Sequence, residues 1–251
     1  AMIDQSCSMA LTYAQHDGRI EFAWRDLVQA MSVIESGAAV EVRYVEHETR
    51  AIAIHEAGHA CAAHVYRPDV ESSRLTIKMR ASGSLGHHQT LQKEERFTNW
   101  NRELFGDLIH GVGAMAAEYV FYGENSNGVS SDLHNVTAEA AWMVGNWGMA
   151  PPRIDVGSVD GETEEQTRRR ITKQFERIGN QLMNRTRGGV DFHGDPIASI
   201  LGDPAKRSLT AQTVGQAFVI AYNFIRVNKD KVEAVAEELI REREIYGDRI
   251  T

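Results

Sequence analysis

The stretch Arg50-Ala-Ile-Ala-Ile-His-Glu-Ala-Gly-His-Ala60 decides how the rest of this chain must be arranged. It is rich in alanine and lies in a pattern that predicts a helix over residues 48–66, ended by Pro68. His55 and His59 are four residues apart, so on a helix their imidazoles share one face and can bind one metal ion. The sequence therefore predicts a metal-binding helix.

Glu56 adds a catalytic group to this helix. Because it adjoins the first histidine, it can point at a water on the metal ion and act as general base. Zinc would lower the pKa of that water toward about 7. The alternative is a chance match on an exposed helix, since only three positions of H-E-x-x-H are fixed. The helical, alanine-rich surroundings favour the zinc site.

The two histidines leave zinc without its usual third protein ligand. A longer motif with a third histidine on the same helix is excluded by Ala62 and Val65. Adjacent residues of a strand point to opposite faces, so at most one of His87 and His88 can approach the metal. The downstream candidates are His64, His87, His88, His110, Glu94, Glu95, Glu118, Asp132 and His134.

Working outward, the periodicity predicts a mainly α fold, in which a helical domain has one small β-sheet next to the H-E-x-x-H helix. Strands are expected at residues 74–79 and 84–91, with a turn at 81–83. Residues 188–206 are rich in Gly, Asp and Pro and are predicted to form a long loop. The other expected helices span 20–35 (closed by Gly37), Thr98 or Asn99 to Gly123, 131–147, 162–187, and two within 210–243 that part near Asn228.

Length and composition limit the class of protein. With 251 residues, 42% hydrophobic and 25% charged, the chain suits one soluble domain over residues 1–251. Its parts are expected to be a leading helix at 20–37, a metal-binding core at 48–149 and C-terminal helices at 160–251. The formal net charge of −8 gives no support to a nucleic-acid partner. Two cysteines make no disulfide framework, which favours a reducing compartment.

Several blocks in order resemble the peptidase domain of the FtsH-type ATP-dependent zinc metalloproteases. They run from the Arg50–Ala60 stretch to Gly148-Met149, and residues 20–37 are similar to the helix that precedes the family's peptidase core. Between these ends lie Leu75-Thr-Ile-Lys, Gly83-Ser-Leu-Gly86, Ala116-Ala-Glu118 with Phe121 and Gly123, and Gly128-Val-Ser-Ser-Asp-Leu133.

The resemblance implies that Asp132 is the third zinc ligand. A carboxylate at a helix start is held ionised by the helix dipole and can donate an oxygen to zinc. From the residues alone, an ordinary N-cap is the alternative. Glu118 is expected either to orient a ligating histidine or to pair with an arginine. The chain departs from the family pattern at Met115 and Ser131, where the family has arginine and asparagine.

The resemblance also implies a function. We expect an endopeptidase with one zinc per chain that cuts unfolded polypeptides, assembled as a homohexamer and fed by an ATPase module. Substrate is expected along the sheet edge near residues 75–79 by strand addition. The chain has no G-x-x-x-x-G-K-[ST] loop, so it is not expected to bind ATP.

Whether an ATPase domain and a membrane anchor were removed or never existed stays open, and Ala1-Met2 is interpreted as a cloning remnant. A cytoplasmic location is expected, at the cytoplasmic face of a membrane if the full-length protein carries an anchor. The alternatives to a peptidase are a non-catalytic FtsH-like scaffold and a zinc hydrolase of non-peptide substrates. Glu56 together with three candidate ligands favours catalysis.

Overall fold

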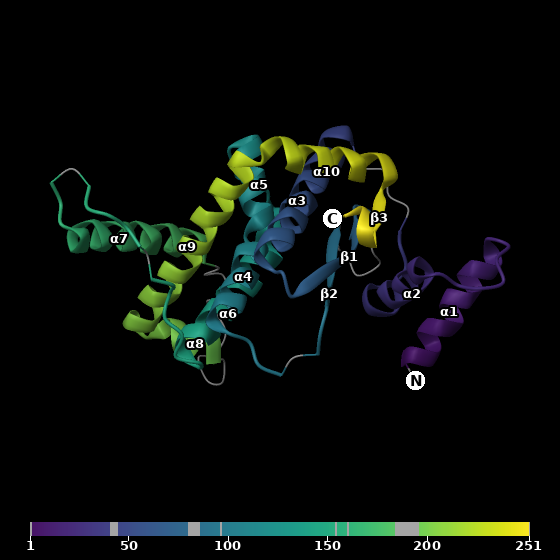
Figure 1. Ribbon diagram of the computed structural model, residues 1–251, viewed down its shortest axis with the longest axis horizontal. Helices are drawn as coiled ribbons and strands as arrows, with labels where there is room; N and C mark the ends of the chain where they lie inside the picture. Colours follow the sequence, from purple (N-terminus) through teal and green to yellow (C-terminus); the bar gives the residue numbers. More distant parts are fainter. Residues whose placement is uncertain are drawn as a thin grey trace.

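The computed structural model describes residues 2–40, 45–79, 86–95, 97–153, 155–159, 161–183 and 196–250. These residues form a mainly helical fold with one three-stranded sheet, which confirms the expected fold class. In Figure 1 the helices α1 (Met2–His16) and α2 (Trp24–Ser36) lie at one end, and α7 (Glu164–Leu182) lies at the other. Within the described residues no helix combines the length and the apolar character needed to span a membrane.

The helix α3 (Glu46–Tyr66) is the central element of the core and matches the helix expected at residues 48–66. Three helices pack against it: α4 (Asn101–Gly111), α5 (Gly113–Tyr122) and α10 (Lys229–Glu242). Half of its buried residues are alanines, whose small side chains let the neighbouring helices approach closely. The H-E-x-x-H sequence therefore lies on a helix that is packed on several sides.

Gly58 makes the closest of these approaches. A Cβ on Gly58 would lie 2.7 Å from the Gly113 carbonyl oxygen and 2.7 Å from Ala117 Cβ, both on α5. A Cβ on Gly113 would in turn meet the Gly58 carbonyl oxygen at 2.8 Å. The two glycines thus let the backbones of α3 and α5 come into contact, which no larger residue would permit.

The sheet is antiparallel and has the order β2-β1-β3. The central strand β1 (Val70–Thr76) pairs with β2 (His87–Gln92) on one side and with β3 (Glu244–Tyr246) on the other. The substrate is expected along a sheet edge near residues 75–79. This is wrong for Leu75 and Thr76, because both residues pair with β2 on one side and with β3 on the other. In the described part of the chain β2 is an outer strand of the sheet, and it contacts α3. The expected turn at 81–83 lies outside the described residues.

A buried ion pair attaches β3 to β1. Arg74 is 1% exposed, and its Nε donates to Glu244 Oε1 at 2.6 Å, while Lys78 Nζ donates to Glu244 Oε2 at 2.9 Å. Burial alone would raise the pKa of Glu244, but these two cations outweigh it and lower the pKa. A three-residue strand with such a partner was not predicted, since its pairing depends on a contact 170 residues away in the sequence.

The single helix expected from Thr98 or Asn99 to Gly123 is two helices. α4 and α5 meet at Val112, whose φ of −91° and ψ of 0° turn the chain between them. Trp100, rather than either expected residue, is the N-cap. Gly123 ends α5 in the left-handed conformation, with φ at 80°, as the sequence predicts.

The C-terminal helices agree with the sequence except in one segment. The helices α6 (Ser130–Gly145), α7, α9 (Pro204–Val227) and α10 follow the expected ones within a few residues, and α9 and α10 part at Asn228.

The loop expected at residues 188–206 is wrong where the structure describes it, since α8 (Pro196–Gly202) and the start of α9 lie there. Residues 188–195 lie outside the described part. Asp203 caps α9 by accepting the N–H groups of Ala205 at 2.9 Å and Lys206 at 3.1 Å. The prolines and the aspartate of this stretch therefore mark helix starts, a role that Pro and Asp also favour.

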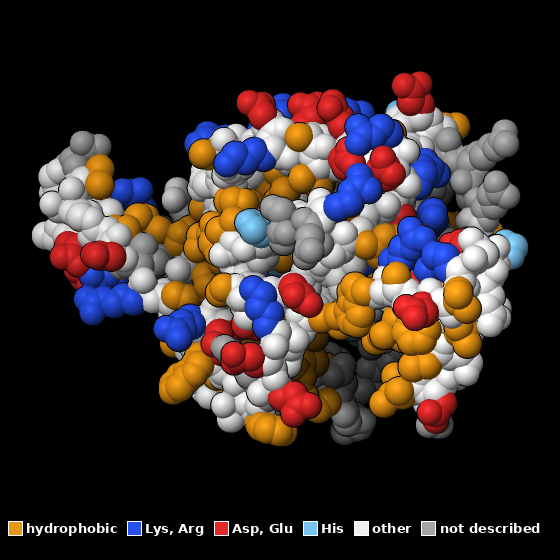
Figure 2. All heavy atoms as spheres, turned by 45° about the vertical axis from the view of Figure 1, so that its right-hand side comes forward, with side chains coloured by type: hydrophobic (Ala, Val, Ile, Leu, Met, Phe, Trp, Pro, Cys, Tyr) orange, Lys and Arg blue, Asp and Glu red, His pale blue; other side chains and the backbone are white. Residues whose placement is uncertain are grey.

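Of the two N-terminal helices, the sequence predicts α2 and not α1. Gly37 closes α2 with φ at 81°, as predicted for the helix at 20–35, whereas α1 was not predicted. Arg19 holds the two helices together by donating to both carboxylate oxygens of Asp26, at 2.7 and 2.8 Å. Figure 2 shows hydrophobic side chains gathered around this pair, whose exposed apolar residues are Met2, Ile3, Leu11, Ile20, Phe22 and Trp24.

Gly58→Ala should destabilise the protein by about 1–3 kcal/mol, because the added methyl group meets atoms of α5 that cannot move without shifting that helix. The measurement is the free energy of unfolding from urea denaturation. Gly202→Ala is the matched control, since a Cβ there has nothing within 4 Å. Equal stability of the two variants would contradict the close contact of α3 and α5.

Candidate metal centre

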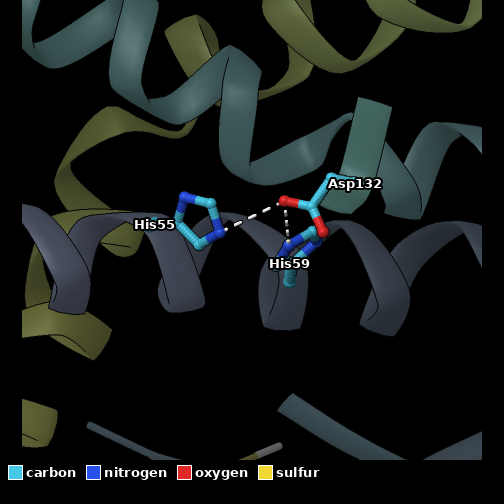
Figure 3. Close-up of side chains that lie close together, drawn as sticks. All are labelled: His55, His59 and Asp132. Carbon is cyan, nitrogen blue, oxygen red and sulfur yellow. Dashed lines mark hydrogen bonds and ion pairs between the residues drawn. The ribbon is translucent and has the colours of Figure 1, made fainter. Parts of the chain in front are cut away.

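Three side chains from two helices converge at one point. His55 and His59 lie one turn apart on α3, with ring centroids 5.1 Å from each other. Asp132, in the first turn of α6, places Oδ2 at 3.3 Å from Nε2 of each histidine. Figure 3 shows the carboxylate reaching across to both rings. Among the described residues this is the one group of three ligand-type side chains whose donor atoms lie within 4.8 Å of one another.

Each histidine is oriented by a hydrogen bond from its other ring nitrogen. His55 Nδ1 lies 2.9 Å from Glu118 Oε1, and His59 Nδ1 lies 2.9 Å from the backbone oxygen of His110. Both partners only accept hydrogen bonds, so both Nδ1 atoms carry the proton. Each Nε2 atom therefore faces Asp132, in a position where it can hold either a proton or a metal ion.

Glu118 also fixes the chain that leads to Asp132. Its carboxylate accepts the Ser126 N–H at 2.6 Å and the Ser126 hydroxyl at 3.1 Å. Ser126 then caps a short 3₁₀ turn, η1 (Asn127–Val129), by accepting the Gly128 N–H at 3.1 Å. Because α6 begins directly after this turn, one buried carboxylate positions both His55 and the helix that carries Asp132. Glu118 is expected either to orient a histidine or to pair with an arginine, and its contacts are those of the first role.

The electrostatics of the site favour a positive charge between the histidines and Asp132. Burial lowers the pKa of His55, but hydrogen bonds with Asp132 and Glu118 outweigh it and raise the pKa to about 10. Burial would raise the pKa of Asp132, yet the two histidines hold it well below its usual range. In the metal-free protein this positive charge is a proton on His55, and a bound cation can take its place.

The donor set fits zinc. Two imidazole nitrogens and one carboxylate oxygen are ligands of catalytic zinc sites, which leave a fourth position open. Ligands at 2.0–2.1 Å from a tetrahedral ion stand about 3.3–3.4 Å apart. The two separations of 3.3 Å between Asp132 and the imidazoles agree with that spacing. His55, His59 and Asp132 could therefore hold the ion with little rearrangement.

Glu56 is the adjoining acid. It is 6% exposed, and burial raises the pKa of its carboxyl group. A carboxylate with a raised pKa is a stronger proton acceptor than an exposed one, as a general base near neutral pH requires. The charges of His55, His59 and Asp132 also act on the pKa of Glu56, so its carboxyl group lies within electrostatic reach of the three candidate ligands.

The remaining candidates for a third ligand lie elsewhere. His64, His87, Glu94 and Glu95 are exposed, and His134 belongs to no three-residue cluster of the described part. His64 lines a separate cavity of about 590 Å³ behind β1.

His110 takes part through its backbone oxygen, a contact that residue type alone cannot indicate. Its ring Nε2 lies 3.2 Å from His88 Nδ1, and His88 Nε2 lies 2.8 Å from the Ser72 hydroxyl. Burial lowers the pKa of both histidines, that of His88 to about 3, so both rings are neutral. They connect the sheet to α4 beside His59.

Comparison with known proteins gives a consistent result. The profile of Peptidase family M41 matches residues 43–197. ATP-dependent zinc metalloprotease FtsH 4 of Sphaerobacter thermophilus is 30% identical over 226 residues, which are 90% of this chain and 31% of that protein. ATP-dependent zinc metalloprotease FtsH of Thermotoga maritima is 25% identical over 251 residues, 100% of this chain and 38% of that protein. The chain thus spans about a third of the length of these curated relatives.

Zinc uptake should release about one proton between about pH 7 and 9, because His55 with its pKa raised to about 10 holds a proton that the metal must displace. The apparent zinc affinity should rise up to tenfold per pH unit and level off above the folded pKa. Calorimetric titration in two buffers of different ionisation enthalpy measures the proton count. Uptake without proton release would show that His55 is already neutral in the metal-free protein.

Glu118→Gln should weaken zinc binding about 10–100-fold, because the charge that orients and polarises the His55 ring is lost. The dissociation constant is measured by competition with a chelator. Glu124→Gln, an exposed acid just beyond α5, is the matched control and should bind zinc like the parent. The same affinity in both variants would mean that Glu118 has only a structural role at Ser126.

Proposed function

This chain belongs to peptidase family M41, and on that premise we propose that it is a zinc-dependent endopeptidase that hydrolyses peptide bonds of unfolded polypeptides. His55, His59 and Asp132 are the proposed zinc ligands, and Glu56 is the proposed catalytic base. The relatives above are named zinc metalloproteases, which supports the metal and the reaction class. The residue roles rest on the site itself.

One observation carries the proposal. The Nε2 atoms of His55 and His59 both face Asp132 at 3.3 Å, while both Nδ1 protons are engaged elsewhere. This arrangement directs one Nε2 lone pair from each histidine and the Asp132 carboxylate toward the same point. It is unfavourable unless a proton or a cation lies there. A buried acid next to such a point is the arrangement that metal-assisted hydrolysis requires.

The chain's own residues account for the proton transfers. Zinc, when bound, supplies Lewis-acid chemistry that polarises the scissile carbonyl and lowers the pKa of a coordinated water toward about 7. Glu56 accepts the proton from the attacking water and then donates it to the leaving amine. Burial, which raises the pKa of Glu56, brings that carboxyl closer to the value that suits both steps.

We place the substrate along the outer edge of β2. Within the described residues β2 is an outer strand of the sheet, and we propose that an extended peptide adds to this edge. A segment that adds to a sheet edge must be unfolded, which supports unfolded polypeptides as the substrate class. β2 begins next to Glu56, so a peptide in this position would pass the proposed base.

The proposed context of the chain follows its relatives. Their names include ATP dependence, and we propose that a homohexameric ring and an ATPase module outside residues 1–251 deliver substrate to this chain. The two free cysteines suit a reducing, cytoplasmic compartment. We propose that residues 1–251 act as one peptidase unit, with a leading helix at 20–37, a core at 48–149 and C-terminal helices at 160–251.

The parent chain should contain about one zinc and cut casein, an unfolded protein, whereas Glu56→Gln should keep the zinc and lose at least 100-fold in rate, since a general base contributes about 10²–10⁴-fold. Metal content and peptide release are measured on the same samples. Glu48→Gln, an exposed acid in the first turn of α3, is the matched control and should retain activity.

The outcomes separate the proposed function from its two rivals. Zinc without cleavage of casein or of short unstructured peptides would favour a scaffold that retains the fold. Cleavage of an ester or non-peptide amide panel in preference to peptides would favour a hydrolase of another class. Protein that neither contains zinc nor takes it up on titration would overturn the metal site itself.

A further inference from the structure

Gly86, the residue directly before β2, lies against the carboxylate of Glu56. A Cβ built on Gly86 would stand 2.4 Å from Glu56 Oε1, 2.8 Å from its Cγ and 2.9 Å from its Cδ. All three distances are shorter than side-chain atoms tolerate. The backbone at the start of β2 can therefore approach the acid this closely only because residue 86 has no side chain.

The requirement for glycine at this position is spatial. Gly86 is not among the glycines with positive φ, so an alanine could adopt its backbone conformation without strain. At Gly58, by contrast, the added methyl group would meet the backbone and Cβ of another helix. At Gly86 the nearest atoms belong to the end of one flexible side chain, so that side chain is what a substitution would displace.

From this contact we infer that Gly86 is a positioning residue for Glu56. Its bare Cα lets the backbone just before β2 lie against the carboxylate of Glu56, a residue that is 6% exposed and belongs to α3. The carboxylate is thereby confined between α3 and β2. The meaning of this confinement for catalysis rests on the proposed function, whereas the contact itself does not.

The same contact links the base to the proposed substrate edge. Gly86 is followed at once by His87, the first residue of β2, so the strand that would pair with a peptide starts directly after the residue that confines Glu56. A peptide added to β2 is then held at a constant distance from the base. The alignment of substrate and base has a large effect on the rate, because a misplacement of about 1 Å can lower the rate about 100-fold.

Gly86→Ala should therefore lower kcat on casein-derived peptides by about 100-fold while KM and the zinc content stay at the parent values. The unchanged KM and zinc content separate loss of position from loss of fold or metal. Gly157→Ala is the matched control, because a Cβ there has nothing within 4 Å. Parent-like kcat in Gly86→Ala would overturn the inference.

A second measurement does not depend on activity. Gly86→Ala should lower the midpoint of thermal unfolding in the parent but not in a Glu56→Ala background, where the carboxylate that the methyl group meets is absent. An equal shift in both backgrounds would show that the glycine is needed for another reason and would overturn the inference. A parent that binds zinc but cuts nothing would reject the proposed function, and this unfolding cycle would still decide whether Gly86 confines Glu56.

Discussion

The contact between the backbones of α3 and α5 at Gly58 and Gly113 is the constraint on which the site depends. It brings Glu118, five residues further along α5, within hydrogen-bond distance of His55. Glu118 then binds Ser126, and Ser126 caps the turn from which α6 begins. Each of these links spans only a few residues. The close approach of α3 and α5 therefore fixes the position of Asp132 through short, hydrogen-bonded segments. Glycine within H-E-A-G-H is therefore a packing residue as much as part of a metal motif.

The converging donor atoms are stabilised by charge as well as by packing. His55 lies between two carboxylates, Glu118 on one ring nitrogen and Asp132 on the other. Buried carboxylates are costly unless a positive charge compensates them, and either a proton on His55 or a bound cation can supply that charge. The fold holds the donors in place before the cation arrives, because each Nδ1 is already engaged. A preorganised site of this kind pays little in side-chain ordering when metal binds.

The sheet supplies an edge strand beside the candidate site, which the helices cannot provide. Its central strand is closed on both sides over residues 74–76 by β2 and by the C-terminal strand, which the buried pair of Arg74 and Glu244 attaches. In the described part of the chain β2 and β3 are the outer strands, and β2 is the one that starts beside Glu56. A segment far from α3 in the sequence thus closes the second side of β1.

The sequence by itself determined the helix that carries His55, Glu56 and His59, the candidate role of these residues and the boundaries of several helices, because these follow from local spacing, small residues and caps. Asp132 came from resemblance to a family, since an aspartate at a helix start is otherwise an ordinary cap. Tertiary structure alone decided the break at Val112, the helix at 196–202, the pairing of β3 and the use of the His110 carbonyl. These features depend on contacts between residues far apart in the chain, and no local pattern of residue types encodes which distant backbone atom will lie within reach.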